Sequence, residues 1–154
     1  MKTIQQWLNE YGESHQDKTN KTIHWICVPI IFFSITGLLF SIKLPFRQAG
    51  IELNVAMFAL LAAVIYYFFL SRTIWVGLLL FTLVCLMFCY LIEQANILPL
   101  WLLCAILFIV AWIGQFYGHN VEGKKPSFFK DLQFLLIGPA WLMSFIYKML
   151  GIKI

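Results

Sequence analysis

The sequence predicts an all-α protein, an integral membrane helical bundle of four to five transmembrane helices with an N-terminal amphipathic interfacial helix. Its composition is 62% hydrophobic and only 12% charged, and its mean hydropathy is +0.84, far from the balance of a soluble domain. The apolar residues gather into runs of roughly 20, the length that crosses a hydrocarbon core of about 30 Å. These runs use almost all of the 154 residues, so one membrane-embedded domain over 1–154 is expected.

The first element is expected to be a surface helix followed by a polar turn, which together cover residues 1–22. Apolar side chains recur there at helical spacing: Ile4, Trp7, Leu8 and Tyr11. Such a stripe is typical of an amphipathic helix, and Trp and Tyr suit the headgroup layer of a membrane. The polar turn is predicted at the sequence DKTN, residues 17–20.

Four apolar runs are long enough to span a membrane. They are residues 23–42, 53–70, 74–92 and 97–117, with a loop expected between the first two at residues 43–52. Residues 118–131 are predicted to form a loop at the candidate site, and a fifth apolar run occupies residues 132–150. Because Pro139 breaks a helix unless neighbouring groups satisfy the freed carbonyl, the fifth run is expected either to span or to re-enter.

The three histidines, His15, His24 and His119, are expected on one side of the membrane. Four crossings separate the start of the first span from the end of the fourth, and an even number returns the chain to its first side. Seven basic residues fall on the histidine side and four on the other, so the positive-inside rule predicts that the histidines face the cytoplasm. The seven are Lys2, Lys18, Lys21, Arg72, Lys124, Lys125 and Lys130, and the four are Lys43, Arg47, Lys148 and Lys153.

The residues around these histidines are of the kinds that bind transition metals. His15 and His24 converge if the chain bends at DKTN, and His119 and Glu122 stand at i and i+3, on one face of a helix. Neutral imidazole together with a carboxylate suits Fe(II), Zn(II) or Mn(II). The candidate ligands are therefore His15, His24, His119 and Glu122.

Simpler roles compete with metal binding at each position. His24 at the end of a span can be an interfacial polar residue, and Asn20 can cap the first span. Glu122 can pair with Lys124 or Lys125 in the headgroup layer.

The net charge of +4 favours lipid headgroups over nucleic acid as the counter-charge. The 11 basic residues are scattered among predicted membrane ends rather than gathered with aromatic residues on one stripe. Membrane lipid is therefore an expected partner and nucleic acid is not. No feature of the sequence supports a particular oligomer.

Two motifs carry a resemblance to a known family. Residues 11–29 read Y-x3-H-x4-N-x3-H-x4-P, and residues 112–127 contain W-x2-Q-F-x-G-H-x2-E-x3-P. In this order they resemble the paired motifs of the 2-hydroxy fatty acid dioxygenases, small membrane proteins with hydrophobic spans between the motifs. The resemblance extends over essentially the whole chain.

The resemblance implies an Fe(II)-dependent dioxygenase that carries out α-oxidation. A 2-hydroxy fatty acid and O2 would give the fatty acid one carbon shorter plus CO2. By motif position, the histidines would be the metal ligands, Glu122 a fourth ligand or a base, and Asn20 and Gln115 groups that orient imidazoles. Many family members space the histidine and the acid one residue further apart, so the resemblance supports His119 more directly than Glu122.

Two other functions fit the same residues. A zinc-dependent membrane lipid hydrolase would use Glu122 as general base and would not need O2. A non-enzymatic membrane adaptor or carrier would use the histidines only to meet headgroups, so alanine at His24 and His119 would leave the metal content unchanged. The expected location is the inner membrane of a bacterium or the endoplasmic reticulum of a eukaryote, with the metal site facing the cytoplasm.

Overall fold

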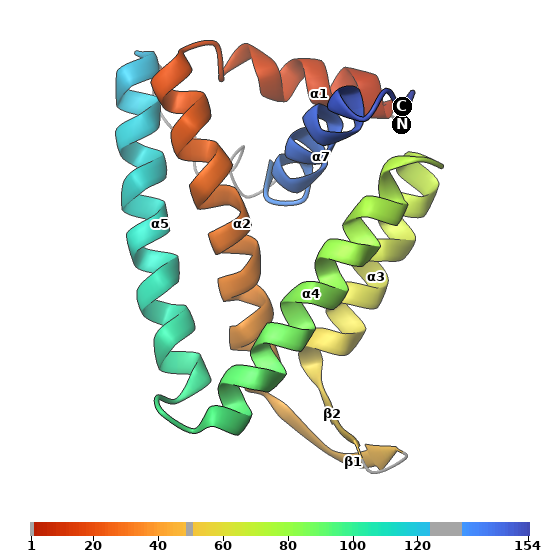
Figure 1. The fold of residues 1–154 in the computed structure, drawn as a ribbon, viewed down its shortest axis with the longest axis vertical. Coiled ribbons are helices and arrows are strands. Elements are labelled where there is room, and N and C mark those ends of the chain that lie inside the picture. The colour runs from red at the N-terminus through yellow and green to blue at the C-terminus, as the bar shows by residue number, and fades with distance from the viewer. Residues whose placement is uncertain (1, 49–50, 124–133) are drawn as a thin grey trace.

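The structure, a computed structural model, describes residues 2–48, 51–123 and 134–154. Within these ranges the chain forms six helices and one two-stranded antiparallel sheet. The elements are α1 (Ile4–Glu13), α2 (Lys18–Phe40), β1 (Lys43–Gln48), β2 (Ile51–Asn54), α3 (Val55–Leu70), α4 (Ile74–Ala95), α5 (Leu100–Glu122) and α7 (Ile137–Met149). Four of these helices run lengthwise, while α1 lies across one end of the bundle and the β1–β2 hairpin lies at the other (Figure 1).

Three of the described helices, α2, α4 and α5, are long and apolar enough to cross a membrane. The expectation of four to five such helices is therefore met only in part. Helix α3 is equally apolar but has 16 residues, and α7 has 13. The apolar run that predicted the second span includes residues that belong to β2, because Asn54 ends the strand and caps α3 by accepting a hydrogen bond from the Met57 amide.

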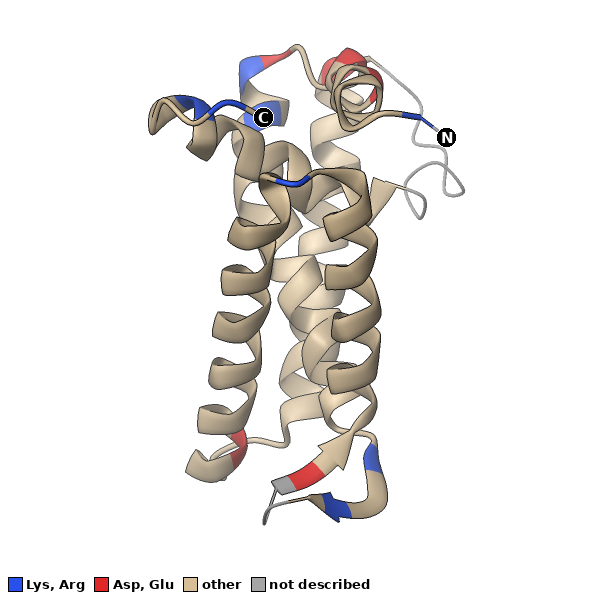
Figure 2. Ribbon diagram, turned by 90° about the vertical axis from the view of Figure 1, so that its right-hand side faces the viewer, with Lys and Arg blue, Asp and Glu red and all other residues tan. Residues whose placement is uncertain are grey.

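The hairpin corrects the prediction of a purely α-helical chain with a loop at residues 43–52. Its strands pair antiparallel, and Arg47 forms an ion pair with Glu52 across them. Lys43 bonds to Glu93 at the end of α4, with 2.8 Å between Nζ and the carboxylate. Figure 2 shows that charged residues gather at the two ends of the molecule and leave the middle uncharged, as a membrane-crossing bundle requires.

Helix α2 begins five residues earlier than the predicted span. Asp17 caps it by accepting hydrogen bonds from the amides of Thr19 and Asn20, at 2.7 and 3.1 Å. The interpretation of Asn20 as the helix cap is therefore wrong. Asn20 lies inside the first turn of the helix and is fully buried. Its side chain bonds to Ser14 and Glu122 instead.

Helices α2 and α5 pack against each other along their length. On α5, Gly114 and Gly118 form a G-x-x-x-G pattern facing α2, and a Cβ built at either would crowd a side chain of that helix. Small residues at this spacing let two membrane helices approach closely. The close approach brings the start of α2 beside the end of α5 (Figure 1).

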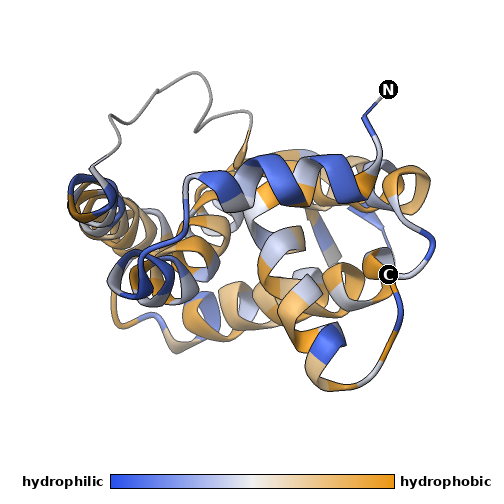
Figure 3. Cartoon of the chain, turned by 90° about the horizontal axis from the view of Figure 1, so that it is seen from above, coloured by the Kyte–Doolittle hydropathy of each residue, from blue (hydrophilic) through white to orange (hydrophobic). Residues whose placement is uncertain are grey.

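The apolar stripe of α1 faces protein rather than lipid. Leu8 and Tyr11 are buried, and Trp7 meets Phe134 edge to face at 6.4 Å between ring centroids. Tyr11 also packs on Trp141 of α7, at 5.2 Å. Seen from above in Figure 3, α1 turns its hydrophilic side outward, so its amphipathic pattern reflects packing on α7.

Helix α7 ends at the same end of the bundle as α1, since Lys148 and Ile152 line a cavity with Gln5 and Leu8. Lys148 was predicted on the opposite side from the histidines, and the C-terminus lies near the N-terminus instead (Figure 1). The physical reason is that the 13 residues of α7 pack on α1, α2 and α4 without the length of a full crossing.

Candidate metal centre

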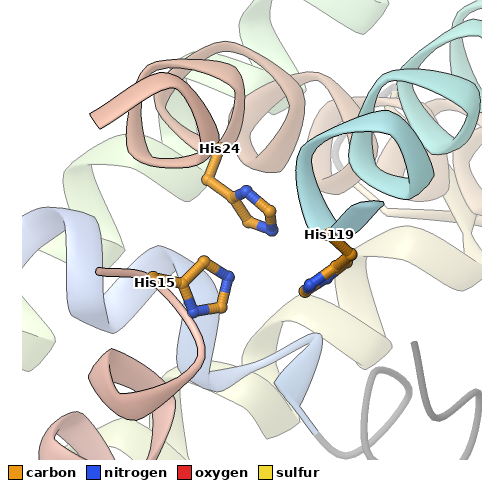
Figure 4. A group of neighbouring side chains, drawn as sticks. All are labelled: His15, His24 and His119. Atoms are coloured by element: carbon orange, nitrogen blue, oxygen red, sulfur yellow. The ribbon is translucent and has the colours of Figure 1, made fainter. Parts of the chain in front are cut away.

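Three buried imidazoles from three separate elements meet at one end of the bundle. His15 lies in the turn between α1 and α2, His24 lies in α2, and His119 lies in the last turn of α5. One ring nitrogen from each histidine lies within 4.8 Å of those of the other two, and Figure 4 shows the rings directed toward a common point. The prediction that the three histidines share one side is confirmed.

Backbone carbonyls fix the ring orientation of two of the histidines. Nδ1 of His15 lies 2.6 Å from the Tyr11 carbonyl, and Nδ1 of His24 lies 3.0 Å from the Asn20 carbonyl. A carbonyl only accepts hydrogen bonds, so Nδ1 carries the proton and Nε2 keeps its lone pair. A carbonyl that accepts from one ring nitrogen fixes the ring and leaves the other nitrogen free to bind a metal, as is usual for histidine ligands.

Aromatic rings hold His15, the member of the cluster that lies outside any helix, in place. Tyr11 stacks on His15 with 4.2 Å between centroids and 5° between the ring planes, and Trp141 lies 5.4 Å away on a tilted plane. His24 meets His15 at 4.1 Å and His119 at 5.1 Å, both edge to face. Burial and stacking together restrict His15, although it lies outside any helix, to one orientation.

The Glu122 carboxylate accepts three hydrogen bonds from the opening of α2. Its donors are the amide of Gln16 at 2.9 Å, the amide of Asp17 at 2.9 Å and Nδ2 of Asn20 at 3.1 Å. Glu122 is the last residue of α5, where the helix dipole disfavours a negative charge, but it lies against the positive N-terminal end of α2. The carboxylate therefore joins the end of α5 to the turn that carries His15.

Asn20 completes the same connection from inside α2. Its Nδ2 donates both to Glu122 and to the carbonyl of Ser14, at 3.1 Å each. Its Oδ1 is buried without a hydrogen-bond partner among the described residues and lies against Gly118, where a built Cβ would come within 2.5 Å of it. Only glycine at position 118 leaves room for this amide.

We expect Gly118→Ala to weaken metal binding without removing a ligand. The two hydrogen bonds of the Asn20 amide hold Oδ1 in place, so the added methyl group must push α5 away from α2 and move His119. We expect a roughly 10- to 100-fold weaker metal affinity, the usual cost of disturbing the groups around metal ligands. Isothermal titration of the purified protein with Fe(II) under anaerobic conditions measures it.

Gly114→Ala is the matched control for that experiment. Its built Cβ meets Sγ of Cys27 at 2.8 Å. This side chain packs among apolar residues and, unlike Asn20, makes no hydrogen bond in the described part of the chain, so it can shift without breaking one. An equal loss of affinity in both variants would show that the helix spacing matters and the Asn20 amide does not.

The histidines line a small pocket of about 30 Å³ together with apolar residues and two polar groups of α5. Gln115 is 8% exposed and lines the pocket beside His24 and His119. The Trp112 indole nitrogen is also buried and has no hydrogen-bond partner in the described part of the chain. Sequence reasoning missed Trp112 as a pocket residue, although its spacing of i, i+3 and i+7 with Gln115 and His119 places all three on one helical face.

The pocket meets the physical requirements of a metal centre. Nε2 of His24 is fully buried and has no hydrogen-bond partner among the described residues, an arrangement that costs free energy unless a ligand or ion satisfies the nitrogen. Three imidazole nitrogens suit iron or zinc. Glu122 is directed at α2 by its three donors, and the group of residues close enough to hold one ion consists of the histidines alone within the described ranges.

Comparison with known proteins adds an independent line of argument. A family model described as 2-hydroxy-palmitic acid dioxygenase Mpo1-like matches residues 1–150. A protein of Saccharomyces cerevisiae named 2-hydroxy-palmitic acid dioxygenase MPO1 is 30% identical over 145 residues, which cover 92% of this chain and 79% of the yeast protein. No solved structure matches the chain.

Proposed function

This chain belongs to the 2-hydroxy-palmitic acid dioxygenase Mpo1-like family, and we propose that it is a membrane dioxygenase that shortens 2-hydroxy fatty acids by one carbon, with Fe(II) held by His15, His24 and His119. The observation that carries the proposal is the buried three-histidine cluster with two Nδ1 atoms bound to backbone carbonyls. A family of dioxygenases and a prepared metal centre together favour oxidation over hydrolysis.

The reaction balances without a reductase partner. The 2-hydroxy acid and O2 give the acid one carbon shorter, CO2 and water, so the organic acid loses four electrons and O2 gains four. When bound, ferrous iron supplies the one-electron chemistry that allows O2 to react with an organic acid. Three protein ligands leave coordination positions open for substrate.

The remaining polar residues of the pocket hold and orient the substrate and the ligands. We assign Gln115 and the Trp112 indole N–H as donors to the oxygen atoms of the acid, since both line the pocket and the indole nitrogen lacks a protein acceptor. Asn20 orients His24 through its carbonyl and Glu122 through its amide. Glu122 is then a positioning residue, whose carboxylate sets the distance between α5 and the turn that carries His15.

The described charges support a proposal for the orientation in the membrane. Six basic residues lie at the histidine end and two at the hairpin end: Lys2, Lys18, Lys21, Arg72, Lys148 and Lys153 against Lys43 and Arg47. We propose that α3 also crosses, that α7 re-enters from the histidine end, and that this end faces the cytoplasm. That arrangement gives four crossings and suits a bacterial inner membrane or the endoplasmic reticulum.

Metal analysis together with turnover tests the function. We expect protein purified in mild detergent without chelators to hold about one iron per chain, as one three-histidine site allows, and His119→Ala to hold none. The loaded protein should release labelled CO2 from a 2-hydroxy fatty acid labelled in its carboxyl carbon, and only when O2 is present. Zinc in place of iron, with no O2 requirement, would favour the lipid hydrolase instead.

A further inference from the structure

A second cavity lies on the other side of one side chain from the histidine pocket. It is lined by residues of α2, α4 and α7, and its volume is about 90 Å³, against about 30 Å³ for the histidine pocket. All its lining residues are apolar: Trp25, Val28, Pro29, Phe81, Pro139, Leu142, Met143 and Ile146. A charged or hydrogen-bonding ligand would lose its solvation there without compensation, whereas an alkyl chain would not.

Val28 separates the two cavities. It lines both of them, and on α2 it belongs to two adjacent faces, one with His24 and Ile31 and the other with Trp25. On α7 the partition is formed by consecutive residues, since Gly138 lines the histidine pocket and Pro139 lines the apolar cavity.

Gly138 lets α7 pack closely against Val28 at this partition. A Cβ built at position 138 would come within 3.1 Å of a Val28 methyl carbon and 3.2 Å of the Tyr11 hydroxyl. With glycine there, Val28 is the one described residue of α2 that lines both cavities.

We propose that the apolar cavity receives the alkyl chain of the acid and that Val28 is the point where the chain passes from the histidine pocket. This inference rests on the proposed function and deepens it by naming the residues that select chain length. The polar donors Gln115 and Trp112 lie on the α5 side of the pocket, opposite the Val28 partition, so the carboxyl end faces α5 while the chain leaves toward α4 and α7. The cavity rim is formed by Trp25, which is 37% exposed, and by the half-buried Ile146.

Filling the cavity from its rim tests the assignment by chain length. Ile146→Trp should lower kcat/KM for long 2-hydroxy acids by about fourfold for each methylene group it displaces, and should leave short acids unaffected. Ile146 contacts neither the histidines nor their pocket, so loss of all activity is not expected. Leu80→Trp is the matched control. Leu80 lies on α4 and is 59% exposed, so this variant should leave the chain-length profile unchanged.

A binding measurement separates the chain site from the reaction. A 2-hydroxy acid that carries bromine near its methyl end should quench tryptophan fluorescence in the wild type, and excess unbrominated acid should reverse the quenching. The same acid should quench Trp25→Phe less, because bromine is a short-range quencher and Trp25 lines the cavity. An acid brominated near its carboxyl end should show no such difference.

The outcomes distinguish the two proposals. Reversible quenching through Trp25 with no turnover of any 2-hydroxy acid would overturn the proposed reaction and leave the chain site in place. Turnover with an unchanged chain-length profile in Ile146→Trp, and no quenching through Trp25, would overturn the chain site and leave the reaction in place. A crossover in chain length together with quenching through Trp25 supports both.

Discussion

Replacing His24 by leucine is expected to abolish iron binding and turnover while leaving the metal-free protein at least as stable as the wild type. The imidazole is fully buried, and its Nε2 has no hydrogen-bond partner in the described ranges. Leucine removes that unsatisfied nitrogen, whose burial costs about 1–3 kcal/mol. The Asn20 carbonyl still accepts the amide of residue 24 within α2, so no new unsatisfied group appears.

Bound iron is expected to reverse this difference, so that the wild type becomes more stable than His24→Leu. Losing one of three ligands should weaken Fe(II) binding by more than about 100-fold, since groups that only orient ligands already contribute 10- to 100-fold. Iron at about 100 times its Kd stabilises a folded protein by about 2.7 kcal/mol. Added iron should therefore raise the Tm of the wild type by several degrees and leave that of His24→Leu unchanged.

Anaerobic thermal unfolding with and without Fe(II), beside metal analysis, makes the measurement. Ile26→Leu is the control, because Ile26, close to His24 on α2, is 58% exposed and should keep the iron response. An iron-dependent rise in Tm that persists in His24→Leu would remove His24 from the ligand set.

An even number of crossings predicted that the three histidines lie on one side of the membrane, but the number of spans did not follow from the apolar runs. Hydropathy reports which residues are apolar, and it does not report where a helix begins. Thus Asp17, rather than Asn20, caps α2, and Asn54 ends a strand before it caps α3. A side chain that accepts an amide hydrogen bond decides each boundary, and several polar residues in each segment had the right chemistry.

The sequence also did not predict at which end of the bundle α7 ends. Its apolar composition suits lipid and protein equally, and only its contacts with α1 and α4 show which of them it meets. Tyr147 illustrates this, since its hydroxyl donates to the Thr73 carbonyl at 3.1 Å and accepts from the Gly77 amide at 3.0 Å. Contacts across 70 residues or more have no local signature, so the side that carries Lys148 could not be predicted.

For Glu122 the sequence was informative in part. The motif identified the residue as a ligand or base, whereas its geometry favours a positioning role. A ligand and a positioning residue occupy the same place in a sequence pattern. They differ in where the carboxylate points, and here it points at three N–H donors of the α2 opening. Substitution separates the two roles.

Glu122→Ala is expected to weaken Fe(II) binding by about 10- to 100-fold while keeping turnover at saturating iron near the wild-type rate. Without the carboxylate, the amides of Gln16 and Asp17 and the Asn20 side chain lose their common acceptor, and the turn that carries His15 is no longer fixed to α5. The three ligands remain, so a high iron concentration should reassemble the centre. Titration of activity against free Fe(II) measures the half-saturating concentration and the maximum rate separately.

Glu122→Gln is the conservative variant that sharpens this test. Its amide oxygen keeps an acceptor for the α2 donors, although it lacks the second acceptor oxygen and the charge, so its iron affinity should fall between those of the wild type and Glu122→Ala. A ligand or general base behaves differently, because glutamine removes its function at any metal concentration. If Glu122→Gln were inactive at saturating iron, the carboxylate would belong to the chemistry, and its three hydrogen bonds to the metal-free protein alone.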